Sequence, residues 1–330
     1  MLSQWAVRWR INISREKSIN RDGRTSLPRR LLGWLFHPFR RRHSIEPLPE
    51  PAEPELFPPE PESPAVDAAP LVWPPERVNI VEKLWGDGYI TAGGAKYVLG
   101  FMPLLALSEK KSLLLLGAGL GGIARTMVDE TGVWISGYES DGELAALGME
   151  KSVMAGKQKR APVKLADYTS LQLKSKYFDA AVSLENFYQV ENKEDLFAAV
   201  AESLRVDGDL IFTDFVLVPS DAPDPAVRDW IKSEPYTPHP WTADKIQSCL
   251  SGLNLNVRPY EDITRQYRSQ LFMGLLKFLA GTTKGELLEI VDDLFEECKY
   301  LGKRIAAIDS GGLKVHQFHA IKLPDKRGGL

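Results

Sequence analysis

The apolar positions of this chain alternate between short continuous runs and longer stretches with helical spacing. The run at residues 113–116 consists of four leucines, and similar runs end near residues 138, 184 and 213. Runs of this length are typical of strands that are buried on both faces of a parallel sheet. The stretches between them have the period of about 3.6 residues that is typical of helices. The pattern therefore predicts an α/β protein.

Toward the C-terminus, the same pattern predicts a helix at residues 242–250, a strand at 254–260 and a last strand at 314–323. Two further helices are predicted before the last strand, at residues 262–280 and 284–308. The first is apolar on nearly all sides, and the second has an amphipathic stripe. This helical insertion is either a cap over a substrate site or simple cover for the core.

A glycine-rich turn separates the first strand from the helix that follows it. Gly117, Gly119 and Gly121 let the backbone come close to a ligand where a Cβ would clash, and the start of the helix offers free N–H groups. The second strand ends at Glu139, whose carboxylate can accept both ribose hydroxyls of a bound nucleoside. These features predict a nucleotide site, but they do not separate NAD from S-adenosylmethionine.

The third strand favours S-adenosylmethionine. It ends in Asp167 and Tyr168, which suit the amino group and the face of an adenine ring; alternatively, Asp167 is only a turn residue. The strand at 177–185 and the turn and strand within 204–214 follow in an order that resembles the class I S-adenosylmethionine-dependent methyltransferases. The resemblance implies a doubly wound, mostly parallel sheet of seven strands, with S-adenosylmethionine bound beyond their carboxyl ends.

A closer resemblance covers residues 84–322. The segment at 84–94 has glycines on both sides of Tyr89 and is similar to the GxGYISxGG segment of the phosphoethanolamine N-methyltransferases. The resemblance implies that Tyr89 orders the site over the methyl donor; alternatively, Tyr89 only packs under a lid. The family pairs this tyrosine with a histidine, and the matching position here is Gln189. A glutamine forms hydrogen bonds but cannot take a proton at neutral pH.

The substrate positions implied by the same resemblance have changed in charge. The family holds a phosphate with an arginine, tyrosines and a lysine, and these positions fall on Glu234, Tyr236, Phe215 and His319. A carboxylate beside a phosphate dianion is repulsive, and more so where water is excluded. We therefore expect Tyr236, Phe215 and His319 to contact an acceptor that is not a phosphobase.

The connection between residues 215 and 241 is long and rich in proline, and it carries Trp230, Tyr236, His239 and Trp241. Long ordered loops of this kind usually act as lids or partner surfaces. The aromatic side chains either form a cage for an amine or seal the open end of the sheet.

Glu185 ends the fourth strand, where methyltransferases often contact donor or acceptor; a solvated turn acid is the alternative. We predict methyl transfer to a small acceptor, an amine or another nucleophile, with Glu185 or Tyr89 orienting it. Positioning and desolvation can carry most of this reaction, and it needs no metal. The rival prediction is a catalytically degenerate chain that serves as an interaction subunit. It rests on Gln189, on the changed substrate positions, and on Leu115 where most relatives have an acidic residue.

Composition divides the chain into three predicted parts. Residues 1–45 form a basic arm with 11 Arg or Lys, two acidic residues and interleaved aromatic residues. Residues 46–76 carry eight acidic residues, eleven prolines and no basic residue, which predicts an extended linker. The methyltransferase domain is predicted at residues 77–330.

The arm combines cations with aromatic residues, which favours an anionic membrane interface or an anionic protein partner. A cleaved targeting segment and a tail without contacts are the alternatives. No apolar run reaches the roughly 18 residues of a membrane span, and the isolated Cys249 and Cys298 suggest neither a metal site nor a redox pair. We expect no nucleic-acid partner and a cytoplasmic location, either free or peripheral at the inner face of a membrane.

Overall fold

A computed structural model of the chain describes residues 71–222 and 224–324. The predicted arm and nearly all of the predicted linker lie outside these residues. Helix α2 (Pro75–Trp85) begins two residues before the predicted domain start at Arg77. Trp73 is also buried, and the Arg77 guanidinium carbon lies 4.1 Å from the centre of its ring. The packed domain therefore includes Trp73 and starts earlier than the sequence predicts.

Within the described residues, the main path of the sheet has seven strands in the spatial order β3-β2-β1-β4-β5-β9-β7. Their bounds are β1 (Ser112–Leu116), β2 (Trp134–Glu139), β3 (Val163–Leu165), β4 (Phe178–Leu184), β5 (Leu204–Leu217), β7 (Leu255–Val257) and β9 (Leu313–Lys322). Strands β1 to β5 are parallel, and β9 is antiparallel to β5 and β7. The two-residue strands β6 (Trp241–Thr242) and β8 (Glu261–Asp262) pair with β5 and β9. The predicted doubly wound, mostly parallel α/β fold is confirmed.

Strands β3, β5 and β7 differ from the sequence prediction. The third strand is predicted to end in Asp167 and Tyr168, but β3 ends at Leu165. A helix end and a turn are predicted at residues 204–208, but β5 already begins at Leu204, directly after α6 (Lys193–Ser203). Its pairing with β4 shifts register between Phe178 and Ala180. The strand predicted at 254–260 is limited to β7, because Pro259 has no N–H to donate to a neighbouring strand.

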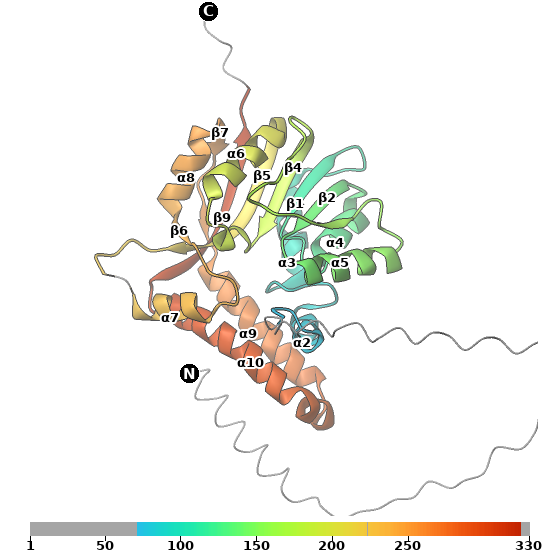
Figure 1. Cartoon of the computed structure of the whole chain (residues 1–330), viewed down its shortest axis with the longest axis vertical. Helices are drawn as coiled ribbons and strands as arrows, with labels where there is room; N and C mark the ends of the chain where they lie inside the picture. The colour runs from blue at the N-terminus through green and yellow to red at the C-terminus, as the bar shows by residue number, and fades with distance from the viewer. Residues whose placement is uncertain (1–70, 223, 325–330) are drawn as a thin grey trace, which may run out of the picture. The chain divides into compact units, whose positions relative to one another are not determined.

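Helices cover both faces of the sheet, as Figure 1 shows. Because neighbouring strand residues point to opposite faces, Leu114 packs with α6 and α8, and Leu113 packs with α3, α4 and α5. The bounds of these helices are α3 (Gly94–Phe101), α4 (Gly122–Thr131), α5 (Gly142–Met154) and α8 (Ala243–Gly252). The central strands are therefore buried on both sides.

The predicted insertion forms α9 (Thr264–Gly281) and α10 (Lys284–Asp309), each within two residues of its predicted bounds. With α2 and α7 (Pro225–Ser233), these helices gather at one end of the sheet in Figure 1. This is the end where the parallel strands finish, because the ring centres of Phe215 near the end of β5 and Tyr267 of α9 lie 5.5 Å apart. The insertion therefore caps the edge at which the site is predicted. Among the helices of residues 71–222 and 224–324, none is long and apolar enough to cross a membrane.

Candidate active site

The glycine turn leads from β1 into α4. Gly117, Gly119 and Gly121 have φ values of 71°, 52° and 78°, a region that glycine adopts readily. A Cβ on Gly117 would lie 2.7 Å from the side chain of Asn186, which follows β4. A Cβ on Gly119 would lie 3.1 Å from Ile90. The turn is thus packed closely against the end of β4 and the segment around Tyr89.

The structure brings Glu139 to this turn. Its Oε2 accepts a hydrogen bond from Gly119 N at 2.8 Å, and its Oε1 accepts from Ser140 N and Asp141 N at 2.8 and 3.0 Å. Burial raises the pKa of this carboxyl group, and the backbone N–H donors oppose the rise. A bound ribose would have to share oxygens that the chain already uses.

Tyr168 also reaches the glycine turn. Its hydroxyl accepts from Gly117 N at 2.8 Å and donates to the Tyr138 carbonyl at 3.1 Å. Asp167 is exposed, and its carboxylate accepts hydrogen bonds from both the backbone N–H and the hydroxyl of Thr169 at 2.8 Å. Asp167 therefore makes the contacts of a turn residue, whereas Tyr168 lies at the predicted donor site.

Tyr89 packs against helix α4. Its side chain is buried, and its hydroxyl forms a hydrogen bond with the hydroxyl of Thr126. The adjoining segment is fixed by a bond from Gly122 N to the Gly88 carbonyl at 2.9 Å. The Tyr89 hydroxyl is therefore held by α4 rather than by a group at the ends of β4 or β5, which matches the packing alternative.

Glu185 has an unusual backbone conformation at the carboxyl end of β4. Its φ of 51° is rare for a residue other than glycine, and such outliers cluster at functional sites. Its carboxylate has no hydrogen-bond or ion-pair partner among the described residues. Burial raises the pKa of Glu185 to about 8; the charge of Arg304 opposes this rise, and those of Asp214 and Glu234 add to it.

Three buried hydroxyls without partners lie in the same region. They belong to Tyr97 of α3, Thr213 of β5 and Tyr267 of α9. None has a partner in good hydrogen-bond geometry within the described chain, although Tyr97 neighbours Thr213 and Tyr267 neighbours Arg304. Burial, followed by the charge of Glu185, raises the pKa of both tyrosines. Since most buried polar groups are hydrogen-bonded, this concentration of unpartnered groups suggests a place for a ligand or for water.

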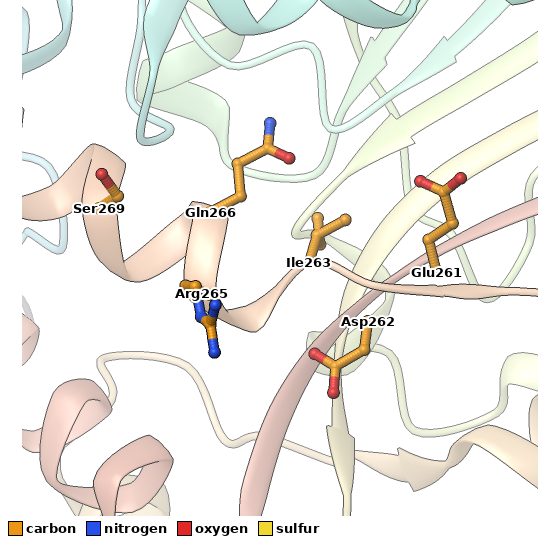
Figure 2. A pocket seen from close by; sticks show the side chains of 6 residues that line it. All are labelled: Glu261, Asp262, Ile263, Arg265, Gln266 and Ser269. Atoms are coloured by element: carbon orange, nitrogen blue, oxygen red, sulfur yellow. The ribbon is translucent and has the colours of Figure 1, made fainter.

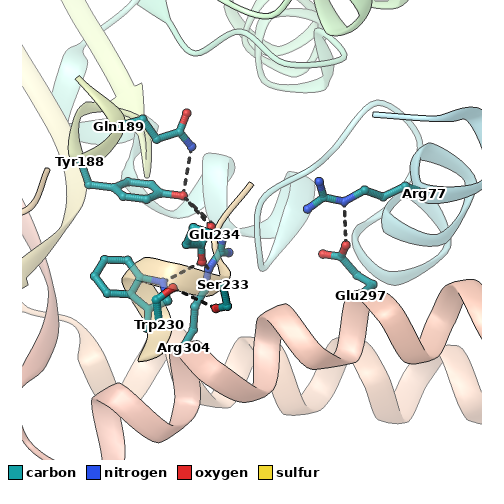
Figure 3. Close-up of polar contacts among 8 residues, drawn as sticks. All are labelled: Arg77, Tyr188, Gln189, Trp230, Ser233, Glu234, Glu297 and Arg304. Carbon is teal, nitrogen blue, oxygen red and sulfur yellow. Dashed lines mark hydrogen bonds and ion pairs between the residues drawn. The ribbon is translucent and has the colours of Figure 1, made fainter. Parts of the chain in front are cut away.

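Figure 3 shows a largely buried ion pair between Arg304 and Glu234. Arg304 of α10 donates from Nε to Glu234 Oε1 at 2.5 Å and from Nη2 to Oε2 at 2.7 Å. The Trp230 indole donates to Oε1 at 2.7 Å, and the Tyr188 hydroxyl donates to Oε2 at 3.4 Å. Burial alone would raise the pKa of Glu234, but Arg304 holds it below its ordinary value. Glu234, which the sequence resemblance aligns with an arginine of the phosphoethanolamine N-methyltransferases, is thus neutralised by an arginine of this chain.

The aromatic residues at this edge pack on one another. The ring centre of Phe215 lies 4.9 Å from that of Tyr188, 5.6 Å from that of Trp230 and 5.5 Å from that of Tyr267. The guanidinium carbon of Arg304 lies 5.5 Å from the Phe215 ring. The aromatic residues therefore pack on one another, and Phe215 also contacts a cation that the protein provides, as expected if they seal the sheet.

The structure separates the other predicted substrate residues. Tyr236 donates its hydroxyl hydrogen to Asp141 Oδ2 at 2.5 Å, next to Glu139 on the donor side. Gln189 donates to the Tyr188 hydroxyl at 3.0 Å. His319 Nε2 lies 2.8 Å from Asp209 Oδ1.

The strand register explains why His319 does not reach the site. Its partner Asp209 pairs with Ala180, four residues before the end of β4 at Leu184. Four residues of a strand span about 13 Å. His319 therefore contacts a residue level with the amino-terminal part of β4 rather than with its carboxyl end, and we do not place it in the acceptor site.

A hollow of about 700 Å³ opens at the start of α9 (Figure 2). It is lined by Glu261, Asp262, Ile263, Arg265, Gln266 and Ser269. Its lining residues do not include Tyr97, Thr213 or Tyr267. The described ranges contain no group of three or more His, Cys, Asp or Glu residues that could hold a metal ion.

Sequence reasoning misses Tyr97, Tyr267 and Arg304. Arg304 does leave a signal, because it stands at helical spacing with Leu301, Ile305 and Ile308 in the buried stripe of α10. A cation on an apolar stripe requires a buried partner, since an unpaired buried charge is very costly.

Comparison with known proteins agrees with this geometry. The family model described as mycolic acid cyclopropane synthetase matches residues 92–318. The chain is 24% identical over 216 residues to phosphoethanolamine N-methyltransferase 3 of Arabidopsis thaliana, a match that covers 66% of this chain and 42% of the relative. It is 24% identical over 228 residues to the phosphoethanolamine N-methyltransferase of Plasmodium falciparum (isolate 3D7), covering 68% of this chain and 82% of the relative. The chain thus spans about two fifths of the plant relatives' length.

Solved structures show the same fold. Phosphoethanolamine N-methyltransferase 2 of Haemonchus contortus in complex with S-adenosyl-L-methionine superposes with a TM-score of 0.64 at 17% identity, over 75% of this chain and 57% of that chain. A putative sarcosine dimethylglycine methyltransferase from Galdieria sulphuraria gives a TM-score of 0.58 at 17% identity, over 75% and 98% of the two chains. These similarities establish the architecture.

Proposed function

Because the chain belongs to the mycolic acid cyclopropane synthetase family and has the class I methyltransferase fold, we propose that it transfers a methyl group from S-adenosylmethionine to a small amine. Relatives named phosphoethanolamine N-methyltransferase support this proposal, as do neighbours crystallised with S-adenosylmethionine or S-adenosylhomocysteine. The observation that carries the acceptor class is Glu185, a carboxylate without a partner one residue before Asn186 at the glycine turn.

The groups at the glycine turn fit the methyl donor. Asn186 Nδ2 is buried without a partner in good hydrogen-bond geometry, and the Asn186 side chain lies directly against Gly117 and close to the Tyr168 hydroxyl. A ligand with carboxylate and ribose groups could satisfy this donor while it shares the oxygens of Glu139. We expect Gly117, Gly119, Glu139 and Asn186 to hold it, with Tyr168 beside them. Bound there, S-adenosylmethionine would supply an electrophilic methyl group.

A bound ammonium group would supply the positive counter-ion that an ionised Glu185 lacks. Arg304 is already paired with Glu234, so an ionised Glu185 has no counter-ion of its own among the described residues. With a pKa of about 8, Glu185 is suited to take a proton from the bound ammonium, which leaves a nitrogen lone pair for attack. The unpartnered hydroxyls of Tyr97 and Tyr267 would hold the nitrogen, and the cap of α9 would exclude water.

Two measurements test this function. Calorimetric titration with S-adenosylmethionine and S-adenosylhomocysteine tests the donor site, and methyl transfer to a panel of small amines tests the acceptor. Glu185→Gln should leave donor affinity nearly unchanged and lower methyl transfer by about 10²- to 10⁴-fold. The matched control Glu202→Gln, at the exposed end of α6, should change neither. Full activity in Glu185→Gln would refute the role of this residue.

A catalytically degenerate chain is the second candidate function. It is favoured by the hydrogen bonds that the groups of the proposed donor site form with one another. Glu139 accepts a hydrogen bond from Gly119 N, and the Tyr168 hydroxyl accepts one from Gly117 N. If these internal hydrogen bonds are permanent, neither S-adenosylmethionine nor S-adenosylhomocysteine will bind in the titration at millimolar concentration. Binding in the micromolar range would reject this candidate.

We also propose that residues 1–45 bring the protein to an anionic membrane surface or an anionic protein partner. The proposal is supported by the sequence of this segment, which combines 11 basic residues with tryptophan and phenylalanine. The segment lies outside the described residues, so its test uses the whole chain.

A further inference from the structure

The carboxylate of Glu234 is surrounded in the way that a bound anion would be. Arg304 donates two hydrogen bonds to it at 2.5 and 2.7 Å, one to each oxygen, in the bidentate geometry that arginine uses for carboxylate ligands. The Trp230 indole and the Tyr188 hydroxyl add donors at 2.7 and 3.4 Å. Four donors from three residues therefore converge on one carboxylate.

The elements that supply these groups are far apart in the sequence. Arg304 comes from the cap helix α10, Trp230 from α7 and Tyr188 from the turn after β4, while Glu234 directly follows α7. In Figure 3 their side chains point toward one another. The Glu234 side chain is only 2% exposed and that of Arg304 is 17% exposed. Phe215 packs on both Arg304 and Tyr267, at 5.5 Å in each case, so the cluster lies close to the Tyr267 side chain of the proposed acceptor site.

We propose that Arg304, Trp230 and Tyr188 form an anion-binding subsite of the acceptor pocket, which Glu234 fills as an internal ligand. Glu234 then decides specificity, because it occupies the place that a carboxylate or phosphate of the acceptor would need. The site consequently takes amines without an anionic group. This statement about acceptors rests on the proposed function, whereas the subsite can be tested without methyl transfer.

Acetate is a suitable probe, because it has the shape and charge of the Glu234 carboxylate. Glu234→Ala removes the internal ligand and leaves the donors in place. By calorimetry, this variant should bind acetate at least tenfold more tightly than the parent, and acetate should raise its melting temperature. Glu234→Ala combined with Arg304→Met lacks the cation and should lose the gain.

A second buried arginine provides the matched control. Arg77 donates a single hydrogen bond to Glu297 at 2.9 Å, and both side chains are largely buried. Glu297→Ala therefore frees a guanidinium that made one contact to its carboxylate partner instead of two. Its gain in acetate affinity should be several-fold smaller than that of Glu234→Ala. An equal gain would mean that any unpaired arginine binds the probe, and would overturn the proposal.

The remaining outcomes also decide the question. If Glu234→Ala folds and binds acetate no better than the parent, the subsite does not exist. If it fails to fold, refolding in acetate or formate should restore it; failure of both anions to do so would reject the proposal. Where methyl transfer is measurable, Glu234→Ala should shift kcat/KM toward amines that carry a carboxylate. Acetate binding without any methyl transfer would support the subsite and count against the proposed function.

Discussion

The buried carboxylates at the carboxyl edge of the sheet are compensated in different ways. Glu234 is paired with Arg304 at both oxygens. Asp214 accepts a hydrogen bond from Tyr188 N at 3.0 Å, and the charge of Lys193 stabilises its ionised form. Burial nevertheless raises the pKa of Asp214 to about 7, and it lowers the pKa of Lys193 to about 8. Glu185 has neither arrangement. Substitutions at these residues should therefore differ in their effects on stability and on activity.

Glu185 should give activity and stability opposite responses to pH. It must be ionised to take a proton, so kcat/KM should rise about tenfold per unit up to pH 8 and then level off. Its folded-state pKa of about 8 lies above the ordinary value of 4.5, so the folded state retains the proton more strongly. The stability from this group is therefore present below pH 4.5 and is lost as the pH rises through 8.

Glu185→Gln should remove both dependences. The measurements are pH–rate profiles and urea unfolding at acidic, neutral and alkaline pH for the parent and the variant. Relative to the variant, the parent should lose stability between the two pKa values. Profiles of the same shape in both proteins would contradict the assignment.

The ion pair of Arg304 and Glu234 should show strong coupling in unfolding experiments. Arg304→Met leaves an uncompensated buried carboxylate and should cost about 3–5 kcal/mol. Adding Glu234→Gln removes that charge and should recover most of the loss. The exposed pair of Arg205 and Asp179, at 2.9 Å, is the control; Arg205→Met should cost less than about 1 kcal/mol. Additive effects of the two buried substitutions would show that the pair is not coupled.

At the scale of elements, the segment from Glu234 to His239 connects three parts of the site. Glu234 binds α10 through Arg304, and Tyr236 binds Asp141 at the start of α5. His239 N donates to the Tyr188 carbonyl at 2.6 Å. The segment thus connects the Arg304–Glu234 pair with Asp141, which lies beside Glu139 of the proposed methyl-donor site. A change in the donor loop can reach the acceptor cluster through these bonds.

Tyr236→Phe should loosen this connection. The variant loses one hydrogen bond to a carboxylate, worth about 1.5–3 kcal/mol locally, while Asp141 still caps α5 through Glu143 N and Leu144 N. Amide exchange at residues 236, 237 and 239 should become at least tenfold faster, and the fold should remain intact. Tyr177→Phe, on an exposed tyrosine, is the control. Unchanged exchange would mean that the bond to Asp141 does not hold the segment.

At the scale of the whole molecule, the grouping of the residues of the proposed donor site could be predicted from the sequence, whereas the grouping of the proposed acceptor residues could not. The glycine turn and Glu139 lie within about two dozen residues, at the ends of neighbouring strands, so the sequence pattern suffices to bring them together. The proposed acceptor residues are Glu185 directly after β4, Tyr97 of α3, Tyr267 of α9 and Arg304 of α10. Only Glu185, which directly follows a strand, stands in a recognisable motif. The others depend on how the cap helices dock.

Side-chain direction limited the rest of the prediction. The segment that contains Tyr89 was recognised from its glycines, but the bond of its hydroxyl to Thr126 depends on the packing of α4. His319 was aligned to a functional lysine, yet the register of β9 places it beside Asp209. A sequence alignment alone therefore does not show which side chains face the site.

The last prediction concerns the arm and the folded domain as separable parts. Residues 1–45 carry a net charge of +9 from 11 basic and two acidic residues. Each cation near an anionic surface contributes about 1 kcal/mol, and aromatic residues add burial at the headgroups. The full chain should therefore sediment with phosphatidylserine vesicles at low salt and be partly released at high salt.

A shortened chain that begins at residue 71 is the informative comparison, because it keeps Trp73 and the bond from Arg77 to Glu297. A start at Arg77 would cut into α2 and expose part of the core. The shortened chain should stay in the supernatant and bind S-adenosylmethionine as tightly as the full chain. Vesicles of phosphatidylcholine alone should retain neither protein. Equal sedimentation of the two chains with anionic vesicles would assign membrane binding to the folded domain, and no sedimentation of either would leave the arm without a lipid target.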